Sequence, residues 1–201
     1  MLDQPFLKVN SMLKLNNRNQ LIVGILLVAL LITTRGHHFA SISHLPSASW
    51  AVFFLAGVYL RPVWMLPVLF AVAGGLDVAA VTWGGVDNFC VSPAYPFLIP
   101  AYASLWLAGR VFAANYKFAW TSLLSLAASV LTGSVLAHLF SSGGFYYFSG
   151  KYAEPTLVEF GQRSAKYFPS SLGTLLFYVG VALLVHVVFK LVSKNAKLAS
   201  A

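Results

Sequence analysis

Long apolar runs separated by short polar segments dominate the sequence. The runs lack the polar face that surface helices of water-soluble proteins keep. A helix needs about 20 apolar residues to cross the core of a bilayer, and several runs approach or reach that length. The expected spans are residues 21–34, 48–60, 63–83, 95–112, 118–140 and 170–189. The pattern therefore predicts an all-α membrane protein with six transmembrane helices.

The apolar runs define a single predicted domain. We expect an N-terminal cytoplasmic segment at 1–18, a six-helix transmembrane domain at 19–192 and a C-terminal cytoplasmic tail at 193–201. The first run is not followed by the small-residue cleavage site of a signal peptide, so we expect it to be retained. The longest polar segment runs from Ser141 to Pro169. Within it, Pro155 suits the first turn of a short surface helix that ends near Lys166.

Charge sets the predicted orientation. The chain has 13 basic and 5 acidic residues, a formal net charge of +8. The basic residues lie at the ends of the apolar runs, and this argues against a nucleic-acid surface. Positive residues favour the cytoplasmic side. The side of the termini would hold Lys8, Lys14, Arg18, Arg61, Arg110, Lys117, Lys190, Lys194 and Lys197, and the other side Arg35, Lys151, Arg163 and Lys166. Both termini are therefore predicted to be cytoplasmic.

The only cysteine, Cys90, lies in a short segment, DNFCVSPAY, between the third and fourth runs. Gly85 and Pro93 disfavour a helix on either side of it. A cysteine thiolate is a ligand for soft metal centres, but a free cysteine is just as often a packed small hydrophobic residue. One cysteine excludes an intrachain disulfide and a zinc site with several cysteines. The residues alone leave both interpretations of Cys90 open.

Other candidate residues fall on the same predicted outer side. Asp77 lies near the outer end of the third run, and an ionisable group at membrane depth is costly enough to indicate a site. The alternative is a carboxylate at a helix end that reaches water. His38 follows the first run and could donate a hydrogen bond to a polar ligand. Its neighbour His37 is expected to be solvated at the interface.

Aromatic and charged residues complete the set of candidates. Tyr95 and Tyr146 belong either to an interfacial aromatic belt or to the wall of a cavity for a large flat ligand. Arg163 is spaced to pair with Glu159 on one helix face, and ligand binding is the alternative. No partner at ligand spacing accompanies His138 or His186, which we interpret as structural. ATP-binding and common hydrolase motifs are absent from the sequence.

The chain resembles a known group of transport proteins. Six short spans in about 200 residues, with an outward-facing polar site, resemble the substrate-binding S-components of energy-coupling-factor vitamin transporters. The lone cysteine in DNFCVSPAY, after a third helix that carries an aspartate, is similar to that of the BtuM family of solitary cobalamin-uptake homologues. The likeness covers the chain from about Asn16 onward. It implies that Cys90 is the axial ligand of the corrinoid cobalt, with His38, Asp77, Tyr95 and Arg163 around the corrinoid.

The resemblance also implies how the protein works. It places a multi-pass protein in the bacterial inner membrane, in contact with lipid and with a corrinoid as its small-molecule substrate. The first run lacks the Ala-x-x-x-Ala pattern by which typical S-components dock on a coupling subunit, so we expect no dedicated ATPase module. A thiolate opposite cyanide would weaken the cobalt–cyanide bond. We therefore predict reductive removal of cyanide from cyanocobalamin, with Cys90 as the catalytic residue.

Three alternatives remain open at this stage. The first is an S-component for another vitamin, such as riboflavin or thiamin, in which Cys90 has no special role. The second is a membrane enzyme in which Cys90 is a nucleophile and His38 its base. The third is a structural subunit of a larger membrane complex, which would bind no small ligand.

Overall fold

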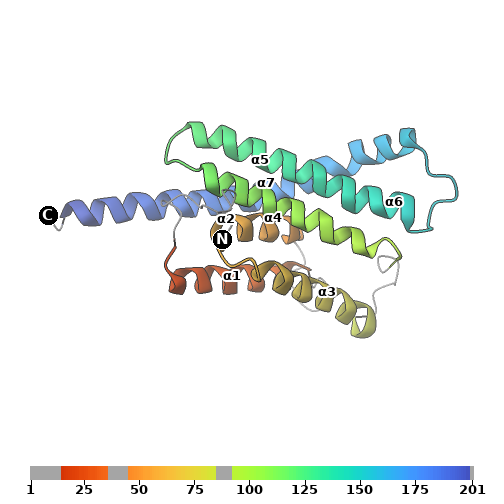
Figure 1. Ribbon diagram of the computed structural model, residues 1–201, viewed down its shortest axis with the longest axis horizontal. Helices are drawn as coiled ribbons and strands as arrows, with labels where there is room; N and C mark the ends of the chain where they lie inside the picture. The colour runs from red at the N-terminus through yellow and green to blue at the C-terminus, as the bar shows by residue number, and fades with distance from the viewer. Residues whose placement is uncertain (1–14, 36–44, 85–91, 200–201) are drawn as a thin grey trace, which may run out of the picture.

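The computed structural model describes residues 15–35, 45–84 and 92–199, which form helices joined by turns (Figure 1). No strand occurs within these ranges, so the predicted all-α fold is confirmed. The elements are α1 (Asn17–Arg35), α2 (Ser49–Tyr59), α3 (Met65–Trp83), the 3-10 turn η4 (Tyr95–Phe97), α4 (Leu98–Asn115), α5 (Thr121–His138), the π-helical turn η5 (Leu139–Gly143), α6 (Gly144–Phe148) and α7 (Leu157–Ala199).

Helices α1 to α5, the short α2 included, run alternately in opposite directions, which gives the bundle two distinct ends (Figure 1). The terminal end holds Asn17 at the start of α1, Leu60 after α2 and Asn115 at the end of α4. The site end holds Arg35 at the end of α1, Trp83 at the end of α3 and α6. The C-terminal part of α7 extends beyond the other helices at the terminal end (Figure 1).

Five of the helical stretches in the described residues are long and apolar enough to cross a membrane. They are Asn17–Arg35, Met65–Trp83, Tyr95–Asn115, Thr121–Phe148 and Leu157–Val192. The chain thus has the helices of a multi-pass membrane protein. The expectation of six full spans is corrected at α2, whose 11 residues rise only about 16 Å, against about 30 Å for the bilayer core.

Helix α2 is apolar on every side because it is enclosed by its neighbours. Nine of its 11 residues are buried, including Phe53 and Phe54. Its packing against α4 depends on two glycines. A Cβ atom at Gly57 would overlap the Trp106 carbonyl group, and one at Gly109 would overlap the Phe54 carbonyl group. Small residues let membrane helices approach closely, so α2 is held as the central element of the core.

Helix α7 also departs from expectation. The surface helix predicted near Pro155 to Lys166 and the span predicted at 170–189 are one helix of 43 residues, with Pro169 inside it. Proline removes one backbone hydrogen bond, but helices in membranes tolerate the loss when side chains and neighbouring helices satisfy the freed groups. The helix therefore carries polar residues near its start directly into the bundle.

Candidate functional site

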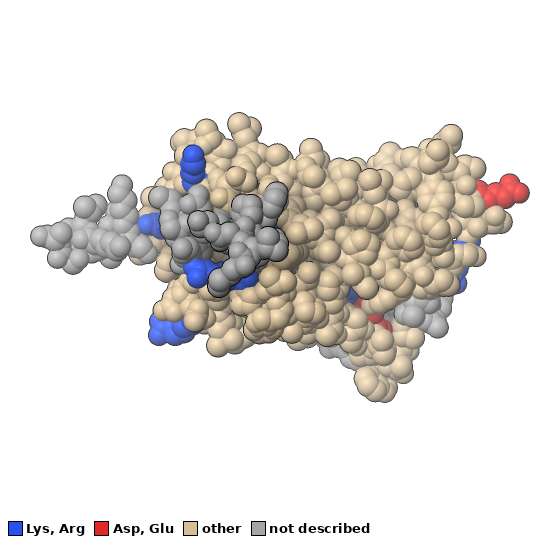
Figure 2. All heavy atoms as spheres, in the orientation of Figure 1, with Lys and Arg blue, Asp and Glu red and all other residues tan. Residues whose placement is uncertain are grey.

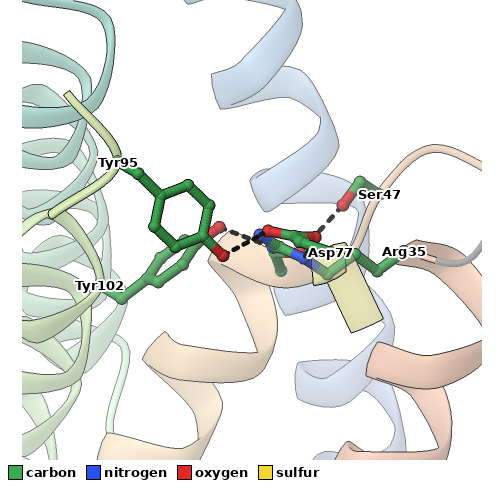
Figure 3. Close-up of polar contacts among 6 residues, drawn as sticks. Arg35, Ser47, Asp77, Tyr95 and Tyr102 are labelled. Carbon is green, nitrogen blue, oxygen red and sulfur yellow. Dashed lines mark hydrogen bonds and ion pairs between the residues drawn. The ribbon is translucent and has the colours of Figure 1, made fainter. Parts of the chain in front are cut away.

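An ion pair between α1 and α3 forms the centre of the candidate site (Figure 3). The Arg35 guanidinium donates from Nε to Asp77 Oδ1 and from Nη2 to Asp77 Oδ2, both at 2.7 Å. The side chains are 13% and 24% exposed, respectively. This two-point geometry is the strongest common arrangement of a charge-assisted hydrogen bond. The two residues are 42 positions apart in the sequence, and their ion pair joins α1 to α3.

Two tyrosines and a serine complete the contacts of this pair. The Tyr95 hydroxyl donates to Asp77 Oδ2 at 2.7 Å. Arg35 Nη1 donates to Tyr102 Oη at 2.7 Å and to Ser49 Oγ at 2.8 Å. Both tyrosine rings point toward the pair from the same side of the bundle (Figure 3). Three other elements, α2, η4 and α4, therefore supply hydrogen-bond partners to Arg35 and Asp77, as a costly charge pair in apolar helices requires.

The local sequence brings these residues together at the ends of their helices. Arg35 is the last residue of α1, and Ser49 is the first residue of α2. The preceding turn is anchored twice, because the Ala48 amide donates to Thr34 Oγ1 at 3.1 Å and the Tyr178 hydroxyl donates to the Pro46 carbonyl at 2.7 Å. These bonds hold the start of α2 against the end of α1 and against α7.

Two exposed tryptophans at the ends of α3 indicate the depth of the ion pair in a membrane. Trp83, which ends α3, is 81% exposed, and Trp64, which precedes the same helix, is 63% exposed. Exposed tryptophans typically mark the two membrane interfaces, and the rise between these two positions is about 28 Å, close to the bilayer core. Asp77 lies six residues before Trp83, or about 9 Å further in along the helix axis. We therefore expect the network to lie at membrane depth.

A polar cavity of about 240 Å³ adjoins Arg35. Its wall is unusually rich in hydroxyl groups for a membrane interior. It is lined by Arg35, Ser47, Ser49, Trp50, Tyr102, Ser170, Ser171 and Thr174. Ser47 Oγ and Ser49 Oγ lie 3.0 Å apart and share a hydrogen bond. Hydroxyl groups both donate and accept, so the cavity can bind neutral polar groups such as amides.

A second cavity, of about 370 Å³, lies between α5, α6 and the start of α7. Tyr146 and Arg163, both predicted as ligand-binding residues, line it. Both also contact Glu159. The Tyr146 hydroxyl donates to Glu159 Oε2 at 2.8 Å, and Arg163 Nη2 donates to Glu159 Oε1 at 2.7 Å. The ion pair expected from the spacing of Glu159 and Arg163 is thus present.

One face of α7 lines both cavities. The second cavity uses Phe160, Arg163, Ser164 and Tyr167, and the first uses Ser170, Ser171 and Thr174. Steps of three, four and seven residues place side chains on the same side of a helix. The continuity of α7 through Pro169 therefore makes a polar stripe that leads from the site end to the Arg35 cavity.

The structure sorts the predicted site residues into three groups. Asp77 and Tyr95 contact each other, and Tyr146 and Arg163 meet at Glu159. His38 and Cys90 lie outside the described residues. Within the described ranges, no group of three histidine, cysteine, aspartate or glutamate side chains could hold a metal ion.

Sequence reasoning missed three members of the site. Arg35 was counted only among the basic residues of the outer side, and Ser49 and Tyr102 were not singled out. The available signal was that Arg35 and Asp77 carry opposite charges at the same predicted end of the first and third apolar runs, where charges are expected to pair.

The two histidines interpreted as structural have hydrogen-bonding neighbours. His138 Nε2 lies 3.1 Å from Ser164 Oγ, and its Nδ1 lies 3.2 Å from Ser142 Oγ. His186 Nε2 lies 3.2 Å from the Tyr116 hydroxyl.

Comparisons with known proteins do not assign a family. No protein-family model matches the chain, and the search of curated proteins finds no significant match.

Proposed function

We propose that this protein is a cobalamin-uptake protein of the bacterial inner membrane, with both termini in the cytoplasm. It binds the corrinoid at the site end, with the Cys90 thiolate as axial ligand of the cobalt. The observation that supports this function most is the convergence of polar side chains from α2, η4 and α4 on the Arg35–Asp77 pair, which joins α1 to α3. Charges at membrane depth are costly, and they typically mark a substrate pathway.

The chemistry of the site end suits a corrinoid. The ring carries neutral amide side chains, which need both donors and acceptors. The serine, threonine and tyrosine hydroxyls of the Arg35 cavity supply both. Tyr146 and Arg163, on the wall of the second cavity, add an aromatic face and a cation. In the sequence, the segment that contains Cys90 joins α3 to η4, and the segment that contains His38 joins α1 to α2.

Binding would also prepare cyanocobalamin for loss of cyanide. The Cys90 thiolate donates its electron pair to cobalt opposite the cyanide. A low-molecular-weight thiol then reduces Co(III) to Co(II) by one electron, and cyanide leaves with the electron pair of the cobalt–carbon bond. Two such thiols, each oxidised by one electron, combine to a disulfide, so two cobalts are reduced for each disulfide formed.

The visible spectrum of cobalamin tests the cobalt ligand directly. Wild-type protein should shift the absorption bands of added cobalamin, and Cys90→Ala should bind the corrinoid without that shift. Tyr152→Phe, which alters the second cavity but no proposed cobalt ligand, is the matched control and should retain the shift. If Cys90→Ala shifts the spectrum as wild type does, the assignment of the ligand is wrong.

Analysis of the purified protein separates the remaining alternatives. Cobalt and a red chromophore that co-purify with the chain support the proposal. A bound flavin or thiamin without cobalt would show instead that the site serves another vitamin. A covalent thioester on Cys90 in the absence of metal would indicate a membrane enzyme in which Cys90 is the nucleophile.

A further inference from the structure

An apolar groove lies between α1 and α3, on the terminal half of the bundle. Its volume is about 700 Å³. Gly24, Ile25 and Val28 line it from α1, and Pro62, Met65 and Val68 line it from the turn before α3 and from α3 itself. None of the corrinoid-binding residues proposed above belongs to it. The groove follows the direction of the helices, so its long wall suits an extended hydrocarbon chain.

One end of the groove is polar and lies at the level of the membrane interface. Asn17 and Gln20 line it there, beside the exposed Trp64. Gln20 Oε1 accepts a hydrogen bond of 3.0 Å from the Arg61 amide, and Gln20 Nε2 donates to the Leu15 carbonyl at 3.1 Å. These bonds fix Arg61 against the start of α1. Tryptophan at this level is typical of the headgroup region.

Exposed positive charge is available at that polar end. The exposed side chain of Arg61 comes between Leu60 and Pro62, both of which line the groove. Arg18 is also exposed, and it follows Asn17 on α1. Helical periodicity places Arg18 between Ile25 and Ala29 around the helix, at the edge of the lining face. Two arginines with exposed side chains are therefore neighbours in the chain of residues that line the groove.

A third guanidinium adds to this positive charge from inside. Arg110 is buried, with 7% exposure, and it donates to the Leu60 carbonyl at 2.9 Å and to the Arg61 carbonyl at 3.3 Å. In the described part of the chain, no carboxylate forms an ion pair with it. The acidic residues described, which are Asp77, Glu154 and Glu159, all belong to the site end. Figure 2 shows basic side chains at the terminal end and acidic ones only toward the other.

We propose that this groove binds one anionic phospholipid, with an acyl chain along α1 and α3 and the headgroup phosphate at Arg18 and Arg61. Guanidinium groups bind phosphate at two points, and basic pockets between transmembrane helices are recognised sites for anionic headgroups. The positive charge of the buried Arg110 strengthens the attraction. The inference is independent of the proposed corrinoid site, because the two sites share no described residue.

Native mass spectrometry of the full chain tests the headgroup contact. The probes are phosphatidylglycerol and phosphatidylcholine with identical acyl chains. Each basic residue near the headgroups contributes roughly 1 kcal/mol, so the wild type should prefer phosphatidylglycerol by about 25-fold. The double variant Arg18→Gln/Arg61→Gln should lose that preference. The control Lys117→Gln removes an exposed charge at the same end, away from the groove. This variant should keep the preference for phosphatidylglycerol.

A second variant tests the acyl-chain contact. Gly24→Leu should fill the groove, because even a Cβ atom there would lie 3.4 Å from the Met65 methyl group. It should weaken binding of both lipids to a similar extent, while its melting curve without lipid shows that it folds.

Three results would overturn the proposal. The first is a wild type that binds both lipids equally, or a Lys117→Gln variant whose preference for phosphatidylglycerol falls as far as that of the double variant. The second is a several-fold gain in lipid binding when residues 1–14 are removed, which would show that the chain's own N-terminal segment occupies the groove. The third is a dimer that forms as lipid is removed and that Gly24→Leu abolishes, which would assign the groove to a second copy.

Discussion

Two arginine–carboxylate pairs lie toward the site end, and they differ in how they connect the fold. Arg35 and Asp77 come from α1 and α3, 42 residues apart, with side chains 13% and 24% exposed. Arg163 and Glu159 lie one helical turn apart on α7, with side chains 38% and 43% exposed. The first pair joins two helices, whereas the second stays within a single helix.

The difference indicates which salt bridges contribute most to the stability of a membrane fold. A half-exposed pair on one helix surface competes with water and is screened by salt, so it contributes little. A largely buried pair repays the cost of desolvation only while both partners are present, and the loss of one leaves an isolated charge. We therefore expect the Arg35–Asp77 pair to dominate stability at this end. Four variants test that contrast, from the largest expected effect to the smallest.

The largest effect is expected from Asp77→Asn. This change leaves the Arg35 guanidinium without a counter-charge and should lower the free energy of unfolding by about 3 kcal/mol. Unfolding of the purified protein in mixed micelles measures it. The double variant Arg35→Gln/Asp77→Asn should recover part of the loss, because no isolated charge remains. Equal losses of unfolding free energy in the single and double variants would show that the isolated charge of Arg35 does not cause the destabilisation.

Arg35→Lys should have the next largest effect. Lysine keeps the positive charge, but its single ammonium group cannot contact both Asp77 oxygens while it also reaches Ser49 and Tyr102. Loss of hydrogen bonds to a charged group should cost about 2 kcal/mol in the same unfolding measurement. A lysine variant as stable as wild type would show that charge alone, without the planar geometry of the guanidinium, holds α1 to α3.

Tyr95→Phe should have a smaller effect on stability. It removes one donor to the charged Asp77 Oδ2 while the ion pair stays intact, which should cost about 1.5 kcal/mol. The corrinoid affinity of the same variant is informative. A large loss of affinity with little loss of stability would support a ligand contact for Tyr95. Parallel losses of both would indicate that Tyr95 only supports Asp77.

Glu159→Gln is expected to have the smallest effect. Its partner Arg163 lies on the same helix and is also half-exposed, so the melting temperature should stay close to that of wild type. Any small difference should disappear at about 1 M salt, where the screening length falls to about 3 Å. A destabilisation as large as that of Asp77→Asn, unaffected by salt, would abolish the distinction between the two pairs.

The same contrast separates what could be predicted about the site from what could not. The Glu159–Arg163 pair follows from a spacing of four residues, because a helix brings such residues together wherever it lies. Asp77 was a candidate because a carboxylate in an apolar run is costly. The shared end of the first and third runs made Arg35 a possible partner, but no local spacing relates the two residues, so the contact itself could not be derived. The convergence of Tyr95 and Tyr102 has the same origin, because it depends on where α4 packs.

The fold was predictable to a similar extent. The run at 63–83 closely matches α3, which begins at Met65 and ends at Trp83. Hydrophobicity predicted α2 as a span but did not show that other helices enclose it. Pro169 was taken as the boundary of a helix, and α7 continues through it. In both cases the outcome depends on neighbouring helices, which cover the surface of α2 and satisfy the backbone groups freed at Pro169. A local sequence pattern does not contain that information.

The sequence by itself determined the helices and their apolar surfaces, because chain geometry and burial in lipid act on each run separately. It also determined that charges collect at the ends of these runs. Only the tertiary structure decided that α2 lies at the centre, that Arg35 meets Asp77, and that α7 carries one polar face past two cavities. These features arise from close packing between helices distant in the sequence, where glycines such as Gly57 and Gly109 set how near two backbones approach.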